Sequence, residues 1–390
     1  MGLTIPTDHG RSLARVDRKV RLLALRALLT RPVEGPLSTP LRQLAGILPE
    51  ALKRSPDAVL AAIGHPDVLG PLLVGVSDLR PWEAMVEQAV PPFLAQIGSL
   101  PEAVIWDRPS DALVTGDTVL GTPVEGLLVD PSGVSARLDG TFVPLAELPA
   151  TPTSLPLAAG PHLALRDGFP LAMDEAHPDK DGNALDLGGH SPEAWVTALD
   201  QALALVKEAL PEWHADLPLS VARILPVGYG AERHLSASYR EAPSQVYMTL
   251  HPDPLTMAEA IVHEGQHGKL NRLLWLDPIL ENGLSDWAPS PVRPDLRPLL
   301  GILLAVHAFV PVALLHERLA DHPWPDPHRF RQRRAEVLAG NRNGLKVLAE
   351  RARPTSAGRR LLREIQALQA RLEAAGAELP AARPDALPPG

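Results

Sequence analysis

Two histidines four residues apart carry the clearest chemical signal in this sequence. His263 and His267 lie in the segment AIVHEGQH (260–267), which has the pattern H-E-x-x-H. In an α-helix, residues four apart lie on one face, so both imidazoles can reach a single ion. The sequence therefore predicts a metal-binding helix, and the plainer alternative is a surface helix with two solvated histidines.

Glu264 separates the two histidines in the sequence, but a helix rotates it by about 100° from His263. It is poorly placed to bind the same ion from the same side. A carboxylate at this position can act as a general base on a metal-bound water, or it can hold the site in shape. We therefore expect Glu264 to be the catalytic carboxylate rather than a ligand.

A third metal ligand must come from further along the chain, and three residues are candidates. Glu281 and Asp286 follow His267 by 14 and 19 residues, and the second spacing suits a zinc peptidase. Lys269 stands where the peptidase pattern has a hydrophobic residue. The stretch that begins at Glu281 resembles the end of a helix followed by a loop, rather than a helix that carries a ligand. His307 stands alone in the apolar run 303–309, where a histidine is ordinarily a hydrogen-bonded core residue. A helix that packs on the metal helix would instead make it a ligand.

The composition narrows the class of protein. There is no cysteine, so thiolate zinc sites, iron–sulfur clusters and disulfides are excluded. The net charge of −9 argues against a general nucleic-acid binder. No signal peptide is expected, because the N-terminus lacks the apolar stretch that such a peptide needs. No membrane span is expected either, because the apolar run 299–315 contains His307 and is better explained as a buried helix. These features favour a cytoplasmic enzyme that uses zinc, iron or manganese.

The pattern of apolar residues predicts an α+β fold that is mostly helical. The helix that carries His263 (256–276) is expected to pack on a second long helix (298–320). Strands are expected at 219–228 and 244–250, an amphipathic helix at 191–210, and a linker at 151–162. Four segments are predicted: a helical N-terminal region (1–100), a small β-rich segment (101–155), a catalytic domain (156–350), and a C-terminal helix with a disordered tail (351–390).

Several stretches besides the H-E-x-x-H pattern resemble a known family. The chain from about 160 to 350 is similar to the HExxH-type peptide-modification proteins, also described as α-ketoglutarate-dependent HExxH peptide β-hydroxylases of ribosomal peptide natural-product clusters. The resemblance is carried by the stretches 176–183 with 185–189, 234–238, 259–270, and 293–298 with 301–309. The first 150 and last 35 residues add little to it.

The resemblance implies Fe(II) as the metal, with α-ketoglutarate and O₂ as cosubstrates and a precursor peptide as substrate. It implies His263, His267 and His307 as ligands, whereas iron oxygenases commonly use two histidines and one carboxylate. The third ligand is therefore His307 or an acid such as Asp286. The distal carboxylate of α-ketoglutarate needs a fixed cation, and Arg297 or Arg293, just before the helix with His307, is expected to supply it.

The leading hypothesis is thus an Fe(II)/α-ketoglutarate-dependent dioxygenase that hydroxylates a β-carbon in a precursor peptide. The first alternative is a zinc metallopeptidase with Glu264 as general base. The second is a non-catalytic protein that binds peptides. Metal content separates the first two, and release of succinate coupled to substrate separates an enzyme from a binding protein.

Overall fold

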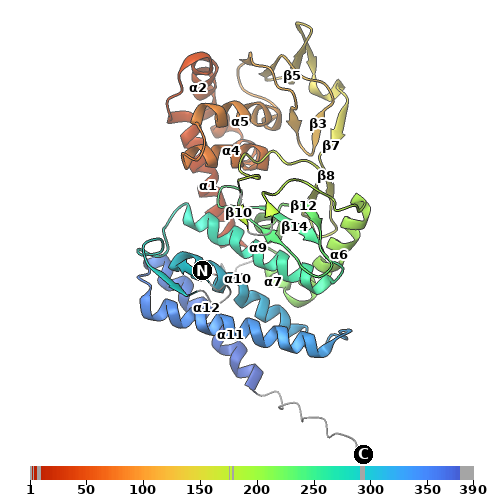
Figure 1. Ribbon diagram of the computed structural model, residues 1–390. Helices are drawn as coiled ribbons and strands as arrows, with labels where there is room; N and C mark the ends of the chain where they lie inside the picture. Colours follow the sequence, from red (N-terminus) through yellow and green to blue (C-terminus); the bar gives the residue numbers. More distant parts are fainter. Residues whose placement is uncertain are drawn as a thin grey trace, which may run out of the picture.

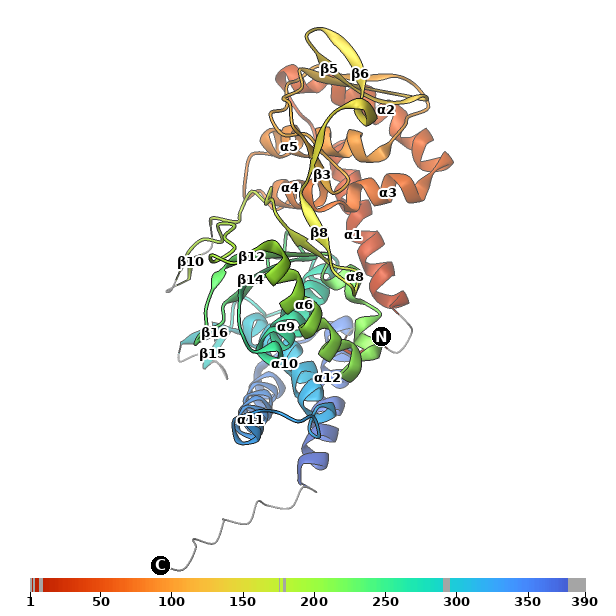
Figure 2. The same ribbon diagram turned by 90° about the vertical axis from the view of Figure 1, so that its right-hand side faces the viewer.

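The protein has a helix-rich α+β fold, seen in two perpendicular views of a computed structural model (Figures 1 and 2). Helices account for 53% and strands for 16% of the chain, which confirms the predicted fold class. The structure describes residues 2, 4–6, 10–174, 176–177, 180–289 and 295–377. Arg293 and the predicted tail beyond 377 lie outside these ranges.

The N-terminal part combines a run of helices with two small antiparallel sheets, as the sequence predicts. The helices are α1 (Arg11–Thr30), α2 (Ser38–Arg54), α3 (Pro56–Gly64), α4 (Pro66–Val76) and α5 (Trp82–Ile97). The strands are β1 (Val104–Trp106), β2 (Val114–Thr115), β3 (Thr118–Leu120), β4 (Gly126–Asp130), β5 (Gly133–Leu138), β6 (Thr141–Pro144) and β7 (Ala150–Pro152). One sheet has the order β1-β4-β5-β6 and the other β2-β3-β7. Helices and strands share one hydrophobic core, so the predicted boundary at residue 100 does not separate two cores.

Helix α1 joins this N-terminal core to the core beneath it. Its first turns place Leu13 and Val16 in the core formed with the central sheet and the C-terminal helices. Val20 and Leu25 belong to the N-terminal core. Figure 2 shows α1 running from the upper helices down toward α8 (Leu217–Ser220). A single helix therefore contributes its apolar face to both cores and ties the two parts of the molecule together.

A mixed five-stranded sheet forms the centre of the molecule. Its order is β13-β14-β12-β9-β8, and the strands are β8 (Ser154–Pro156), β9 (His162–Ala164), β12 (Arg223–Tyr229), β13 (Ser236–Ala237) and β14 (Gln245–Leu250). Strand β12 pairs in parallel with both β14 and β9, while the outermost strands run antiparallel to their neighbours. The predicted linker at 151–162 is wrong, because residues 154–156 form β8 at the edge of this sheet.

Both faces of the sheet are covered, which explains why every residue of β14 is buried. Alternate side chains point to opposite faces. Val246 and Met248 join the core with α6 (Pro192–Ala209), whose Ser191 cap is confirmed. Tyr247 lies on the other face in a small cluster that includes Val74 of α4. The helix with His263 packs on the first of these faces.

The C-terminal part is a group of long helices (Figure 1). They are α9 (Pro254–Leu274), α10 (Leu299–Arg318), α11 (Pro327–Arg351) and α12 (Ser356–Ala377), with the strand pair β15 (Trp287–Pro289) and β16 (Leu296–Pro298) between α9 and α10. A second strand pair, β10 (Ala176–His177) and β11 (Lys180–Asp181), precedes α6 in the chain. Helix α10 lies against α9, as predicted for the second long helix. Alone among the described helices it is long and apolar enough to cross a membrane, although the bent pair α3 and α4 passes the same test together. Since 72% of its apolar stretch is buried inside the structure, α10 has the burial of a core helix.

Candidate metal centre

Helix α9 carries the histidines and is fixed at its start and along its length. Asp253 caps the helix by accepting a hydrogen bond from the Leu255 amide at 3.0 Å, and Pro254 occupies the first turn. Gly265 allows close packing, because a Cβ at this position would lie 2.7 Å from the Trp213 ring. A Cβ on Gly268 would likewise lie 2.7 Å from the carbonyl of Ser220. The two glycines explain how a polar helix can lie this deep in the molecule.

His263 and His267 converge as the sequence predicts. Their Nε2 atoms lie 2.9 Å apart, and the rings stand nearly perpendicular at 86°. Burial lowers the pKa of His263 well below its usual value and also lowers that of His267. Both rings are therefore neutral at neutral pH and can offer a lone pair, which is the form that binds metals. The Nδ1 atoms are buried and have no hydrogen-bond partner among the described residues.

The two Nε2 atoms are close enough for one ion to reach both. Two nitrogens that each bind one ion at about 2.0–2.1 Å lie roughly 3 Å apart, and the contact of 2.9 Å between the rings falls in that range. The donor set of two neutral imidazoles fits iron, manganese or zinc, so the residues present suit the metal that the resemblance implies.

Glu264 is held by two hydroxyls from the edge strand. Ser236 donates a hydrogen bond to Oε1 and Ser238 to Oε2, each at 2.7 Å, and the Glu264 side chain is nearly buried. Both serines belong to the 234–238 stretch that carries the family resemblance. The carboxylate is therefore fixed between α9 and β13, and its charge acts on His267.

Glu259 lies one turn before His263 and had no place in the sequence-based site. His316 of α10 contacts its Oε1 at 2.7 Å, and Arg333 of α11 donates to Oε2 from Nε and Nη2 at 3.0 and 2.8 Å. Burial alone would raise the pKa of Glu259, but these partners outweigh it and hold the pKa at about 2. The signal in the sequence was the i, i+4, i+8 spacing of Glu259, His263 and His267.

His307 is completely buried on α10, where it lies beside Gln266. The Gln266 amide nitrogen lies 3.2 Å from the His307 carbonyl oxygen, to which it donates, and 3.5 Å from His307 Nε2. Burial lowers the pKa of His307 to about 3. Within the described ranges, no set of three His, Asp or Glu side chains is close enough to hold an ion. His307 as third ligand therefore stays a prediction.

The remaining sequence candidates lie elsewhere. Asp286 is paired with Arg351 and accepts a hydrogen bond from Asn282, so its carboxylate is already engaged. Glu281 is exposed. Arg297 lies on β16 and forms an ion pair with Asp295 at 2.9 Å. Arg293 lies outside the described residues.

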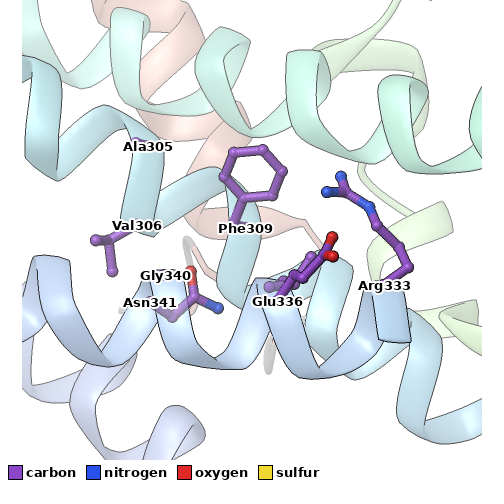
Figure 3. A pocket seen from close by; sticks show the side chains of 8 residues that line it. Ala305, Val306, Phe309, Arg333, Glu336, Gly340 and Asn341 are labelled. Atoms are coloured by element: carbon purple, nitrogen blue, oxygen red, sulfur yellow. The ribbon is translucent and has the colours of Figure 1, made fainter. Parts of the chain in front are cut away.

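A cavity lies between α10 and α11 (Figure 3). It measures about 190 Å³, and its lining includes Val306, Phe309, Arg333, Glu336 and Asn341. Phe309 connects it to the metal centre, because its ring centroid lies 4.5 Å from that of His263. Arg333 connects it to Glu259 through the ion pair described above. No member of this group was singled out from the sequence.

Comparison with known proteins adds no relative to this geometry. No protein-family model matches the chain, and no curated protein matches it. The function must therefore be argued from the residues themselves.

Proposed function

We propose that this protein is an Fe(II)- and α-ketoglutarate-dependent dioxygenase that hydroxylates a β-carbon of a residue in a ribosomally made precursor peptide. The observation that carries the proposal is the convergence of His263 and His267, whose neutral Nε2 atoms lie 2.9 Å apart. Two imidazoles on successive helical turns make a binding site for one transition-metal ion.

In this proposal His263 and His267 would hold the iron, and α-ketoglutarate and O₂ would be the cosubstrates. When bound, the ion would supply the redox chemistry that transfers one oxygen atom to a C–H bond. His307 is the third ligand in this proposal, and its Nδ1 atom has no hydrogen-bond partner among the described residues.

The environment of Glu264 supports the hydroxylase over the zinc metallopeptidase. A general base must take a proton from a metal-bound water, so its carboxylate must be directed at that water. Here both oxygens of Glu264 are directed at Ser236 and Ser238, from which they accept short hydrogen bonds. Glu264 is better suited to anchor α9 to the edge strand and to stabilise the adjoining His267 by its charge.

Strand β13 supports a peptide substrate. It lies at the edge of the central sheet, with β14 on one side and no strand on its other side in the described part of the chain. An extended peptide can add to such an edge through main-chain hydrogen bonds. Ser236 and Ser238 of this segment contact Glu264, so a peptide on the edge would pass close to the histidines.

The direct test is turnover under controlled metal supply. Protein loaded anaerobically with Fe(II) is mixed with α-ketoglutarate, O₂ and a peptide encoded beside its gene. The proposal predicts that each hydroxylated peptide gains one oxygen atom and that one succinate and one CO₂ are released. Cleaved peptide with bound zinc would support the metallopeptidase, and peptide binding with no turnover would support a non-catalytic protein.

A second experiment, on metal content and stability, tests His307 as the third ligand. If His307 binds the metal, His307→Gln loses iron to the same extent as His263→Ala. If His307 only packs against Gln266, the variant retains iron and loses stability instead. Metal analysis and thermal unfolding of the two variants separate these outcomes.

A further inference from the structure

A groove follows α1 where this helix passes α3 and α8 (Figure 2). Its volume of about 470 Å³ is more than twice that of the cavity between α10 and α11. Four arginines of α1 line it, together with the apolar side chains of Ala14, Leu60, Ala61 and Leu219. The groove, called the α1 groove below, therefore combines an apolar surface with a local concentration of positive charge.

Three of the arginines share one face of α1. Arg11, Arg15 and Arg18 are four and three residues apart, and all three are exposed. Residues at these spacings are neighbours on a helix, where like charges destabilise it. The row also begins at the first residue of α1, where the helix dipole disfavours a cation, and the first turn contains no acidic residue. This arrangement is unfavourable for α1 itself, which points to a partner outside it.

The two aspartates of the α1 groove leave much of this positive charge uncompensated. Asp17 is buried and already forms ion pairs with two other arginines, at 2.6 and 2.8 Å. Asp57 approaches Arg18 only to 3.9 Å, and their side chains are 96% and 56% exposed, so water screens this pair. Arg15 forms no ion pair within the part of the chain that the structure describes. Arg15 and Arg18 can therefore each bind a carboxylate of a partner.

We propose that the α1 groove binds an acidic amphipathic helix of a partner protein. Carboxylates of the partner pair with Arg15 and Arg18, while its apolar side chains lie against Leu60 and Leu219. Arg11, Arg15 and Arg18 follow one another at about 6 and 4.5 Å along the axis of α1, which are also the steps between residues four and three apart on a partner helix. Guanidinium groups can bind carboxylates through two parallel hydrogen bonds, so the row of arginines also orients the partner.

The chemistry of the α1 groove favours a protein over a nucleic acid. Nucleic acids are held mainly through their phosphates by a basic excess. This chain has a net charge of −9, and two carboxylates lie among the four arginines. The apolar part of the lining suits leucine-like side chains, which a phosphate backbone lacks. The inference does not rest on the proposed function, because neither His263 nor His267 lines the groove.

The test uses the full-length protein with chelator present and a fluorescent peptide of about 15 residues, long enough to form a helix. The peptide carries glutamates along one helical face with leucines beside them, and fluorescence anisotropy measures its binding. A matched peptide with glutamine in place of glutamate should bind at least about 10-fold more weakly, because it loses several ion pairs at once. A peptide with serine in place of leucine should also bind more weakly, because the apolar lining then has no counterpart.

The corresponding protein variant combines Arg15→Glu with Arg18→Glu. It should weaken binding of the glutamate peptide about 10-fold or more, because two attractions become repulsions. Its thermal stability should not fall, since the substitutions remove like charges from α1. The matched control combines Arg329→Glu with Arg331→Glu, which makes the same change of charge at two exposed residues of α11 and should leave binding unchanged.

Three results would overturn the inference: no binding of the glutamate peptide, equal binding of the glutamine peptide, or unchanged binding in the variant of Arg15 and Arg18. Tighter binding of a DNA or RNA duplex than of the glutamate peptide at the same salt concentration would also overturn it, because the groove would then serve a nucleic acid. The comparison of peptides uses the unaltered protein and so does not depend on how the variants fold.

Discussion

Helix α9 presents two polar faces that are differently satisfied: Lys269 and Arg272 on one face are buried, whereas His263 and His267 on the other are partly exposed. On its back face, Lys269 pairs with Asp216 at 2.9 Å, and Arg272 bonds to Asp17 at 2.8 Å and to the Pro243 carbonyl at 2.6 Å. On its histidine face, the Nδ1 atoms of His263 and His267 have no partner among the described residues, and their Nε2 atoms have only each other.

The difference separates structure from function on one helix. A buried charge that is matched by another element of the fold is explained by the fold. Converging ring nitrogens matched only by one another call for an ion from outside. The back face therefore positions the helix, while the histidine face is available for chemistry, and each prediction below tests one side of this division.

The largest effect is expected on metal binding. His263→Ala and His267→Ala should each weaken iron binding more than about 100-fold, because losing a ligand exceeds the 10- to 100-fold effect of losing a supporting partner. Anaerobic metal analysis measures this, with the exposed His328→Ala as control. Unchanged iron content in the variant that lacks both histidines would exclude this metal site.

The next effect should fall on stability through the back face. Asp216→Asn leaves the fully buried Lys269 ammonium without its counter-charge and should lower the free energy of unfolding by about 3–5 kcal/mol. Replacing both residues with apolar ones should recover much of this loss. Urea unfolding followed by circular dichroism gives the values, and a loss below about 1 kcal/mol would show that the pair does not hold the helix.

Acid should weaken the contact between Glu259 and its partners. Its pKa in the folded protein is about 2, below the ordinary 4.5, so the stability it contributes is complete above about pH 4.5 and is lost as the pH falls toward 2. The shift corresponds to at most about 3 kcal/mol. Glu259→Gln should therefore flatten the decline in unfolding free energy between pH 5 and pH 3, measured against Glu373→Gln. An unchanged pH profile would mean that His316 and Arg333 do not hold this carboxylate.

The smallest effect belongs to the serines of the edge strand. Ser238→Ala removes one of the two hydrogen bonds to Glu264. It should lower the free energy of unfolding by about 1.5 kcal/mol, the lower end of the range for a hydrogen bond to a charged group, because the bond from Ser236 remains. Ser236→Ala should behave alike, and the double variant should cost more than either. Losses near zero in all three variants would show that these hydroxyls do not hold the Glu264 carboxylate, and would remove this argument against the metallopeptidase.

Local sequence patterns predicted the long helices and the pairing of His263 with His267, because both depend on the spacing of residues close in the sequence. The helices that carry His263 and His307 appear where expected, and the four-residue spacing brings His263 and His267 together. Strand β8 was missed because a short edge strand rich in Pro and Ser resembles a linker. A strand of three residues leaves too weak a pattern to be recognised.

The partners of the histidine face could not be predicted because they come from distant parts of the chain. Arg333 lies 74 residues after Glu259, and its side chain reaches α9 only because α11 packs on α10. Within the run of basic residues around 331–334, nothing in the sequence distinguishes Arg333 from the exposed Arg331 or the buried Arg334. Likewise the apolar setting of His307 indicates burial, but the face of α10 that meets Gln266 depends on the helix packing.

The most direct test of the central claim is the visible absorption of the anaerobic Fe(II) protein during titration with α-ketoglutarate. If His263 and His267 hold iron with positions left for the cosubstrate, a charge-transfer band should appear and saturate at one equivalent in the wild type. It should be absent in His263→Ala. Bound iron with no band on adding α-ketoglutarate, or a protein that takes up zinc and excludes iron, would contradict the account.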